Sequence, residues 1–214
     1  WDKEGHKYLD ALAGIAVNSV GHAHPRLVRA IADQASKLIH CSNYFNIDLQ
    51  EKVAEKLVEH SGLEAVFFCN SGLEANECAI KIARKFGHTK GIEVPNIIVL
   101  KHAFHGRSIA TLSATGNPSV REDFSPYTEG FIFVDESDLN GIRKIVEENK
   151  NVVAIFFEPI LGEGGVVPID LSVIKGIREI CDEHDLLMMC DEVQCGMGRS
   201  GKWFAHQWAE IKPD

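Results

Sequence analysis

Residues 186–196 read LLMMCDEVQCG, an apolar run that ends directly in Asp191 and Glu192. A run of about four to eight apolar residues without alternation is typical of a strand buried on both faces, as in a parallel sheet covered by helices. Ligands of such sheets bind just beyond the carboxyl ends of the strands. Asp191 is therefore expected at a ligand site, where it needs a cationic partner because an unpaired buried charge is very costly.

The rest of the chain continues this pattern of apolar strands and amphipathic helices. Strands are predicted at residues 66–69, 97–100, 131–134, 152–157 and 186–190, and helices at residues 26–39, 49–59, 74–86, 139–148 and 171–184. Residues 7–20 are interpreted as short strands broken at Gly14. Strands that alternate with helices of about 10 to 15 residues predict an α/β fold, with a mostly parallel sheet wrapped by helices.

The composition limits the class of protein. The chain is 45% hydrophobic and 25% charged with a net charge of -9, which describes a globular protein and argues against a nucleic-acid surface. No apolar stretch reaches the roughly 18 to 20 residues of a membrane span, and the first residues do not resemble a signal peptide, so we expect a cytoplasmic protein. A start at Trp1 and an end at Asp214 predict an internal fragment of a longer chain.

Cysteine and histidine spacing argues against disulfides and metal sites. The six cysteines include no C-x-x-C pair and lie mostly in apolar runs, which favours buried, reduced thiols. His22-x-His24 and His102-x-x-His105 lack the flanking ligands that a zinc site needs. We therefore expect no metal.

Two predicted strands are followed by groups that suit an anion. Ser71 and Gly72 come after residues 66–69 and open a helix whose free N–H groups and positive dipole end would hold a phosphate. The same residues also fit an ordinary N-cap. Phe104 and Arg107 follow residues 97–100, and an arginine suits bidentate capture of a carboxylate, although a core Phe beside a surface Arg is the plain alternative.

Two further strand ends bring carboxylates to the same edge of the sheet. Glu158 and Glu163 lie in a glycine-rich loop after residues 152–157, and Asp191 and Gln194 follow the last strand. For Glu163, a solvated loop carboxylate is the alternative interpretation. A flat, phosphorylated, cationic heterocycle would satisfy all of these groups, and pyridoxal 5'-phosphate is such a ligand, with its ring on Phe104 and its protonated ring nitrogen on Asp191.

Five ordered segments resemble the class III (subgroup II) pyridoxal-phosphate-dependent aminotransferases, with the acetylornithine aminotransferases as the nearest group. They read AGIAVNSVGHAHP, FFCNSGLEANE, AFHGRSIATLSATG, EPILGEGGV and DEVQCGMGRSGKWFA. The resemblance covers essentially the whole chain. It implies that residues 41–214 are an incomplete large domain of fold type I, preceded at residues 1–40 by a piece of the small domain and a linking helix. It also implies that the Schiff-base lysine lies beyond Asp214.

The resemblance implies a role for each residue of the expected cofactor site. Ser71, Gly72 and Leu73 would lie at the phosphate, the last two through their N–H groups. Phe104 would stack on the ring, Val193 would pack behind it and Gln194 would donate to its 3-oxygen. Asp191 would pair with the pyridine nitrogen and is the expected catalytic residue.

Two residues are implied on the substrate side. Arg107 would bind the substrate α-carboxylate, and Glu163 would stand nearby as the partner of a movable arginine outside these residues. Two positions depart from the family pattern, because Leu73 replaces a small residue and Leu161 replaces a glutamine. The first change is tolerable if only the Leu73 N–H acts, and the second removes one polar contact near the glutamates.

The implied function is transfer of the terminal amine of N-acetylornithine to 2-oxoglutarate, in arginine biosynthesis, by a homodimer without nucleic-acid or membrane partners. Ornithine, succinylornithine and 4-aminobutyrate remain open as donors, and a non-catalytic truncated subunit remains open as a role. GMGRSG at residues 196–201 also matches the dinucleotide-binding pattern. However, Asp191 and Glu192 directly before these glycines would repel a pyrophosphate.

Overall fold

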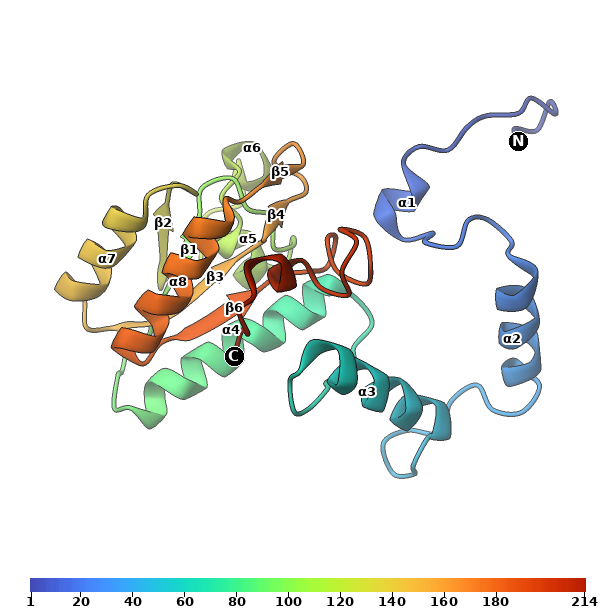
Figure 1. Ribbon diagram of the computed structural model, residues 1–214, viewed down its shortest axis with the longest axis horizontal. Coiled ribbons are helices and arrows are strands. Elements are labelled where there is room, and N and C mark those ends of the chain that lie inside the picture. Colours follow the sequence, from blue (N-terminus) through green and yellow to red (C-terminus); the bar gives the residue numbers. More distant parts are fainter. The chain divides into compact units, whose positions relative to one another are not determined.

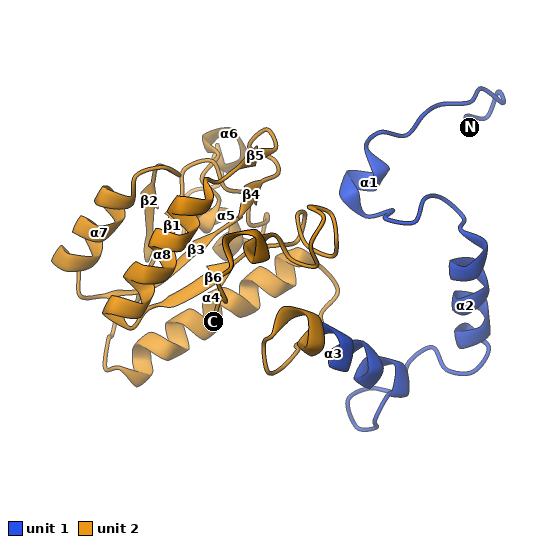
Figure 2. Cartoon of the chain, in the orientation of Figure 1, with its two compact units in different colours: residues 1–57 blue, residues 58–214 orange.

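The computed structural model describes residues 1–214 as two compact units, Trp1–Leu57 and Val58–Asp214 (Figures 1 and 2). The division falls inside helix α3 (Asp48–Ser61), which extends the predicted helix by one residue at its start and two at its end. The predicted boundary at residue 40 refers to the domains of the family and stays a prediction.

The first unit contains no strand, so the strands predicted within residues 7–20 were wrong. The segment instead forms α1 (Ala13–Ala16), in which Gly14 and Ile15 have φ of 64° and 56°. Such left-handed backbone cannot continue an extended strand. Helix α2 (Pro25–Ala35) follows, with Pro25 in the first turn where its missing N–H costs nothing, and it ends four residues before the predicted end.

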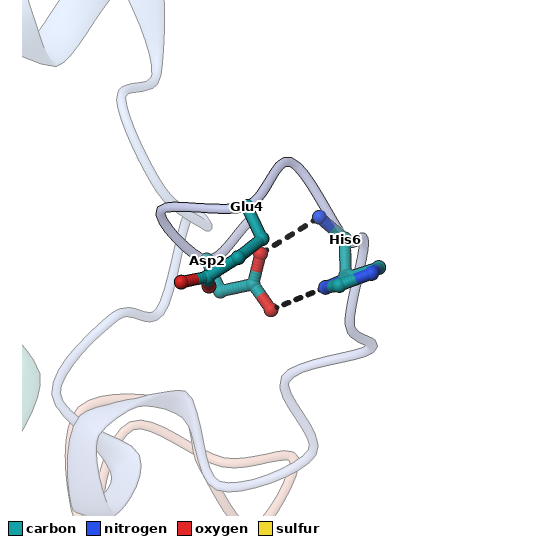
Figure 3. Close-up of side chains that lie close together, drawn as sticks. All are labelled: Asp2, Glu4 and His6. Atoms are coloured by element: carbon teal, nitrogen blue, oxygen red, sulfur yellow. Dashed lines mark hydrogen bonds and ion pairs between the residues drawn. The ribbon is translucent and has the colours of Figure 1, made fainter.

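A turn at the start of the first unit brings three potential metal ligands together, Asp2, Glu4 and His6 (Figure 3). The Asp2 carboxylate already accepts hydrogen bonds from the backbone N–H and the Nδ1 of His6, both at 2.8 Å. Glu4 and His6 are exposed and Asp2 is partly exposed, and the hydrogen bonds between Asp2 and His6 close a turn at the surface. Three histidines of the sequence motifs have carboxylate partners too: His22 bonds to Asp10, His102 to Glu136 and His105 to Asp191.

The second unit is built on a four-stranded sheet in the order β2-β1-β3-β6, in which every neighbouring pair is parallel (Figure 1). The strands are β1 (Asn96–Leu100), β2 (Phe131–Val134), β3 (Val152–Phe157) and β6 (Leu187–Cys190). A separate antiparallel hairpin joins β4 (Ile160–Leu161) and β5 (Val167–Pro168). The mostly parallel sheet confirms the predicted fold class.

Helices cover both faces of this sheet. The helices of this unit are α4 (Gly72–Thr89), α5 (Ile109–Ala114), α6 (Pro118–Arg121), α7 (Leu139–Glu148) and α8 (Leu171–His184), followed by a 3-10 helix, η1 (Ala205–Ala209). The residues of β3 are divided between two cores: Ile155 packs with α7 and α8, and Phe156 packs with α4. All six β3 residues are buried, as an apolar run between two helix layers requires.

The strand predicted at residues 66–69 is absent. These residues pair with no strand of the sheet, and Phe67 and Phe68 are 67% and 37% exposed. An apolar run forms a strand only where a neighbour takes up its backbone hydrogen bonds, and neither edge of the sheet, β2 or β6, pairs with it. The segment still leads into α4, which begins two residues before the predicted start and ends three residues after the predicted end.

Candidate functional site

A cavity of about 300 Å³ opens at the carboxyl ends of β1, β3 and β6, beside the first turn of α4. The lining residues come from four separate segments: Gly72, Leu73 and Asn76 from α4, Phe104, His105, Gly106 and Arg107 after β1, Glu158 after β3, and Asp191, Val193 and Gln194 after β6. All of the predicted site residues line this cavity except Ser71 and Glu163. The edge of a parallel sheet is the place where ligands of such folds bind.

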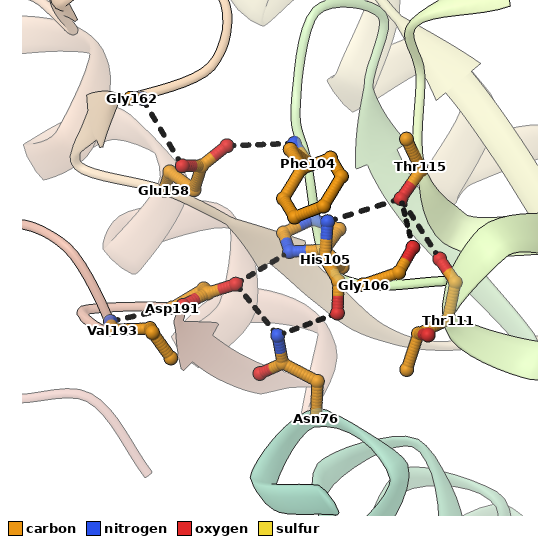
Figure 4. Close-up of polar contacts among 10 residues, drawn as sticks. All are labelled: Asn76, Phe104, His105, Gly106, Thr111, Thr115, Glu158, Gly162, Asp191 and Val193. Carbon is orange, nitrogen blue, oxygen red and sulfur yellow. Dashed lines mark hydrogen bonds and ion pairs between the residues drawn. The ribbon is translucent and has the colours of Figure 1, made fainter. Parts of the chain in front are cut away.

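Asp191 is the most constrained acidic side chain of the cavity (Figure 4). It is 5% exposed, and its Oδ2 accepts hydrogen bonds from Nδ2 of Asn76 and Nδ1 of His105, both at 2.8 Å. Its Oδ1 accepts the backbone N–H of Val193 at 3.0 Å. Three N–H donors therefore hold the carboxylate in one orientation, and no Lys or Arg side chain pairs with it.

Asn76 and His105 fix each other as well as Asp191. The Asn76 amide donates its second hydrogen bond to the backbone oxygen of His105 at 2.9 Å. The imidazole of His105 stacks on Phe156, with 3.9 Å between ring centroids, and its Nε2 is buried without a partner. An Nδ1–H tautomer satisfies the bond to Asp191 and leaves no N–H unpaired at Nε2.

The first turn of α4 forms another wall of the cavity. Ser71 Oγ accepts the N–H of Glu74 at 3.2 Å, so Ser71 acts as the N-cap, in agreement with the plainer of the two interpretations of its sequence. The N–H of Ala75 bonds to the Ser71 oxygen, which leaves those of Gly72 and Leu73 for an anion at the cavity. A Cβ on Gly72 would lie 2.6 Å from Val193, so only glycine allows this approach.

The aromatic and basic residues after β1 lie together. The guanidinium of Arg107 is 5.9 Å from the centroid of the Phe104 ring, and both line the cavity. Gly106 has a φ of 129°, and a Cβ there would meet Thr111 Oγ1 at 2.6 Å, so the turn between them requires glycine. Glu163 lies in the exposed loop between β4 and β5, and its role at the substrate stays a prediction.

Glu158, which the sequence predicted at this edge of the sheet, lies in the cavity wall, although the family resemblance implied no specific role for it. It is 4% exposed, and burial raises its pKa to about 6 even though the backbone N–H groups of Phe104 and Gly162 donate to it. The nearby negative charge of Asp191 acts in the same direction as burial. Asn76 and His105 were not predicted at the site, because single polar residues in a helix or a loop carry no spacing signal.

Residues 196–201 do not form a dinucleotide site. They are turns and bends, and the next helical element is the short η1, which begins at Ala205. The dinucleotide fingerprint requires its glycines to open an α-helix directly. Glu192, which precedes these glycines, is engaged instead by the N–H groups of Ala205 and His206.

Comparison with known proteins agrees with this geometry. A family model described as "Aminotransferase class-III" matches residues 1–214. The acetylornithine aminotransferase of Nitrosomonas europaea is 52% identical over 214 residues, which is all of this chain and 54% of that protein. The chain therefore spans about half the length of the curated relatives it matches.

Solved structures give the same relationship. The N-acetylornithine aminotransferase of Stenotrophomonas maltophilia matches with a TM-score of 0.86 at 40% identity, and the ornithine aminotransferase of Toxoplasma gondii with 0.94 at 34%. Both matches cover all of this chain, and they cover 53% and 51% of those chains. Since the family model extends over every residue described, the chain belongs to the class III aminotransferases.

Proposed function

We propose that residues 1–214 are part of a pyridoxal-phosphate-dependent aminotransferase that moves the terminal amine of N-acetylornithine to 2-oxoglutarate, in arginine biosynthesis. The observation that supports it most is Asp191, a buried carboxylate in the cavity wall with N–H donors but no Lys or Arg partner. A ligand with a protonated ring nitrogen would complete its pairing. When bound, pyridoxal 5'-phosphate supplies an electron sink for the exchange of amino groups.

The residues around Asp191 fit the other parts of this cofactor. The N–H groups of Gly72 and Leu73, at the start of an 18-residue helix, suit its phosphate. Phe104 offers a ring face, and Val193 lines the same cavity and packs against Gly72. In this proposal Asp191 holds the proton of the ring nitrogen, and Gln194 orients the ring through its 3-oxygen.

Arg107 is the proposed ligand of the substrate α-carboxylate. Its planar fork can bind a carboxylate through two parallel hydrogen bonds, and it lines the same cavity as Asp191. Glu163 is proposed near the far end of the substrate, as the partner of an arginine outside these residues. The names of the relatives support both acetylated and free ornithine as donors, because both kinds of aminotransferase match the whole chain.

A homodimer in the cytoplasm completes the proposal. Phe67 and Phe68, directly before α4, are exposed and pair with no strand of their own sheet, which supports their burial against a second copy. None of the helices combines the length and the apolar character that crossing a membrane requires. The cofactor-binding lysine is proposed to belong to a segment outside residues 1–214.

The test uses the full-length enzyme, meaning the protein of the relatives' length that carries residues 1–214. Its kcat/KM is measured with N-acetylornithine, ornithine, succinylornithine and 4-aminobutyrate, each with 2-oxoglutarate. We expect N-acetylornithine to give the highest value and reactions without 2-oxoglutarate to give no sustained turnover. Absence of turnover with all four donors would overturn the proposed function, and a higher value for another donor would change the substrate.

A further inference from the structure

Glu158 joins two loops that are separate in the sequence (Figure 4). Its Oε2 accepts the backbone N–H of Phe104 at 2.8 Å, and its Oε1 accepts the backbone N–H of Gly162 at 3.1 Å. Phe104 belongs to the loop after β1, and Gly162 to the loop that follows β4. One buried carboxylate therefore connects two backbone segments at the carboxyl edge of the sheet.

Each of these segments holds a different wall of the cavity. The Phe104 segment presents the aromatic ring and, three residues later, Arg107. The Gly162 segment lies against Gln194, because a Cβ on Gly162 would be only 2.2 Å from Oε1 of that side chain. A shift of either segment would therefore move a group that faces the cavity.

A negative charge on Glu158 is unfavourable for folding, because the side chain is buried. Glu158 is 4% exposed and close to the Asp191 carboxylate, and no Lys or Arg side chain is paired with it. The titratable groups that face it are Asp191 and Cys195, which follow β6, and His105, which follows β1. An ionised carboxylate accepts two N–H bonds more strongly than any neutral side chain of its size, which offsets part of this cost.

We propose that Glu158 is a positioning residue, which in its ionised form clamps the backbones of Phe104 and Gly162 and thereby holds the Phe104 ring and the Gln194 amide on two sides of the cavity. The clamp itself follows from the hydrogen bonds of the chain. Its consequence for a cofactor rests on the proposed function. The two parts can be tested separately.

The clamp is tested by hydrogen exchange of single amides in the full-length enzyme stripped of cofactor. Glu158→Gln replaces one acceptor oxygen by an NH₂ group, so one of the two backbone N–H groups loses its acceptor. We expect the protection factor of Phe104, Gly162 or both to fall about tenfold or more. Unchanged protection at both amides would overturn the clamp, whatever the enzyme binds.

Glu192→Gln is the matched control. Glu192 is also a buried carboxylate with two backbone donors, Ala205 and His206, but it does not line the cavity. Its substitution should lower the protection of those two amides and leave Phe104 and Gly162 unchanged. Equal losses at Phe104 and Gly162 in both variants would indicate general loosening and would contradict the proposal.

The positioning role is tested by cofactor affinity, measured from the absorbance of bound pyridoxal 5'-phosphate. We expect Glu158→Gln to raise its Kd about tenfold, and the wild-type Kd to rise below about pH 6 while that of the variant stays level over this range. Faster exchange of the Phe104 or Gly162 amide together with an unchanged cofactor Kd would show that the clamp only stabilises the fold, and it would overturn the positioning role. A wild-type enzyme that binds no pyridoxal phosphate would refute the proposed function, and the exchange result would still decide the clamp.

If the Glu158→Gln variant does not fold, the pH dependence of hydrogen exchange in the wild-type enzyme tests the clamp instead. Protonation weakens Glu158 as an acceptor, so the protection factors of Phe104 and Gly162 should fall about threefold between pH 7 and pH 5. Protection that is level over this interval would contradict a clamp that depends on the ionised form.

Discussion

Replacement of Asp191 by Asn tests the centre of the site, and the contacts of Asp191 predict that the change also lowers stability. The carboxylate accepts the N–H groups of Asn76 and His105 on one oxygen and that of Val193 on the other. In either orientation the amide NH₂ of Asn faces at least one of these donors. The less costly orientation leaves the Val193 N–H without an acceptor, so we expect a loss of about 1–3 kcal/mol in the free energy of unfolding.

The loss of charge should have a larger effect on function. A hydrogen bond to a charged partner contributes about 1.5–3 kcal/mol, which corresponds to a cofactor Kd roughly 10- to 150-fold higher. Under the proposed role of Asp191, turnover at saturating cofactor should fall by several orders of magnitude, because a neutral residue would not keep the ring nitrogen protonated.

Both effects are measured in the full-length enzyme, by urea unfolding without cofactor and by kcat at saturating cofactor. Asp170→Asn is the control, since Asp170 caps α8 and does not line the cavity, and Asn is an equally good N-cap. An Asp191→Asn enzyme that keeps more than about a tenth of wild-type kcat, a barrier change below about 1.4 kcal/mol, would refute a catalytic role for Asp191.

Three further predictions concern the walls of the cavity. Arg107→Lys replaces a fork by a point charge, so the KM for the amino donor should rise about tenfold, and an effect confined to the cofactor Kd would contradict the carboxylate role. Gly162→Ala puts a Cβ 2.2 Å from Oε1 of Gln194, so the melting temperature should fall by a few degrees and the cofactor Kd should rise; unchanged values would show that Gln194 moves freely. The pKa of Glu158 is raised from 4.5 to about 6, so its ionisation should lower the free energy of unfolding by about 2 kcal/mol as the pH rises from about 4.5 through 6. Urea unfolding of Glu158→Gln should lack this decline, and the same pH dependence in both proteins would assign it to other groups.

The elements that the sequence predicted best are those with strong local signals. Residues 131–134, 139–148, 152–157 and 171–184 form β2, α7, β3 and α8 with the predicted bounds. In both helices an Asp side chain caps the first turn, through Asp138 and Asp170. The ends of these apolar runs are set by neighbouring caps and turns, so tertiary contacts change the bounds of the elements little.

The wrong predictions concern segments whose state depends on a distant partner. Residues 66–69 have the composition of a buried strand, yet none of the strands in the sheet pairs with them. Residues 7–20 have apolar spacing, but the backbone turns left-handed at Gly14. Composition predicts that a segment can form a strand, whereas the sheet decides which strands are paired.

Most of the predicted site residues line one cavity, whereas the polar groups that orient them were not predicted, and the roles assigned to the site residues stay predictions. Placing ligands at the carboxyl ends of parallel strands brought Phe104, Arg107 and Asp191 to one cavity. The groups that orient them lie far away in the sequence: Asn76 is 115 residues from Asp191, and His105 is 86 residues from it. Contacts at such separations are set by the fold and leave no periodic pattern.

Asp191 was predicted to pair with a cationic group of the ligand, and no Lys or Arg side chain of residues 1–214 pairs with it. A buried carboxylate was expected to need a cation, yet the chain provides hydrogen-bond donors from Asn76, His105 and the Val193 backbone. These donors stabilise the anion without cancelling its charge, and Glu158 adds a second buried carboxyl group to the same wall. Negative charge therefore remains at the end of the cavity formed by β3 and β6, and a cationic ring nitrogen of a bound ligand is the complement that would make its burial favourable.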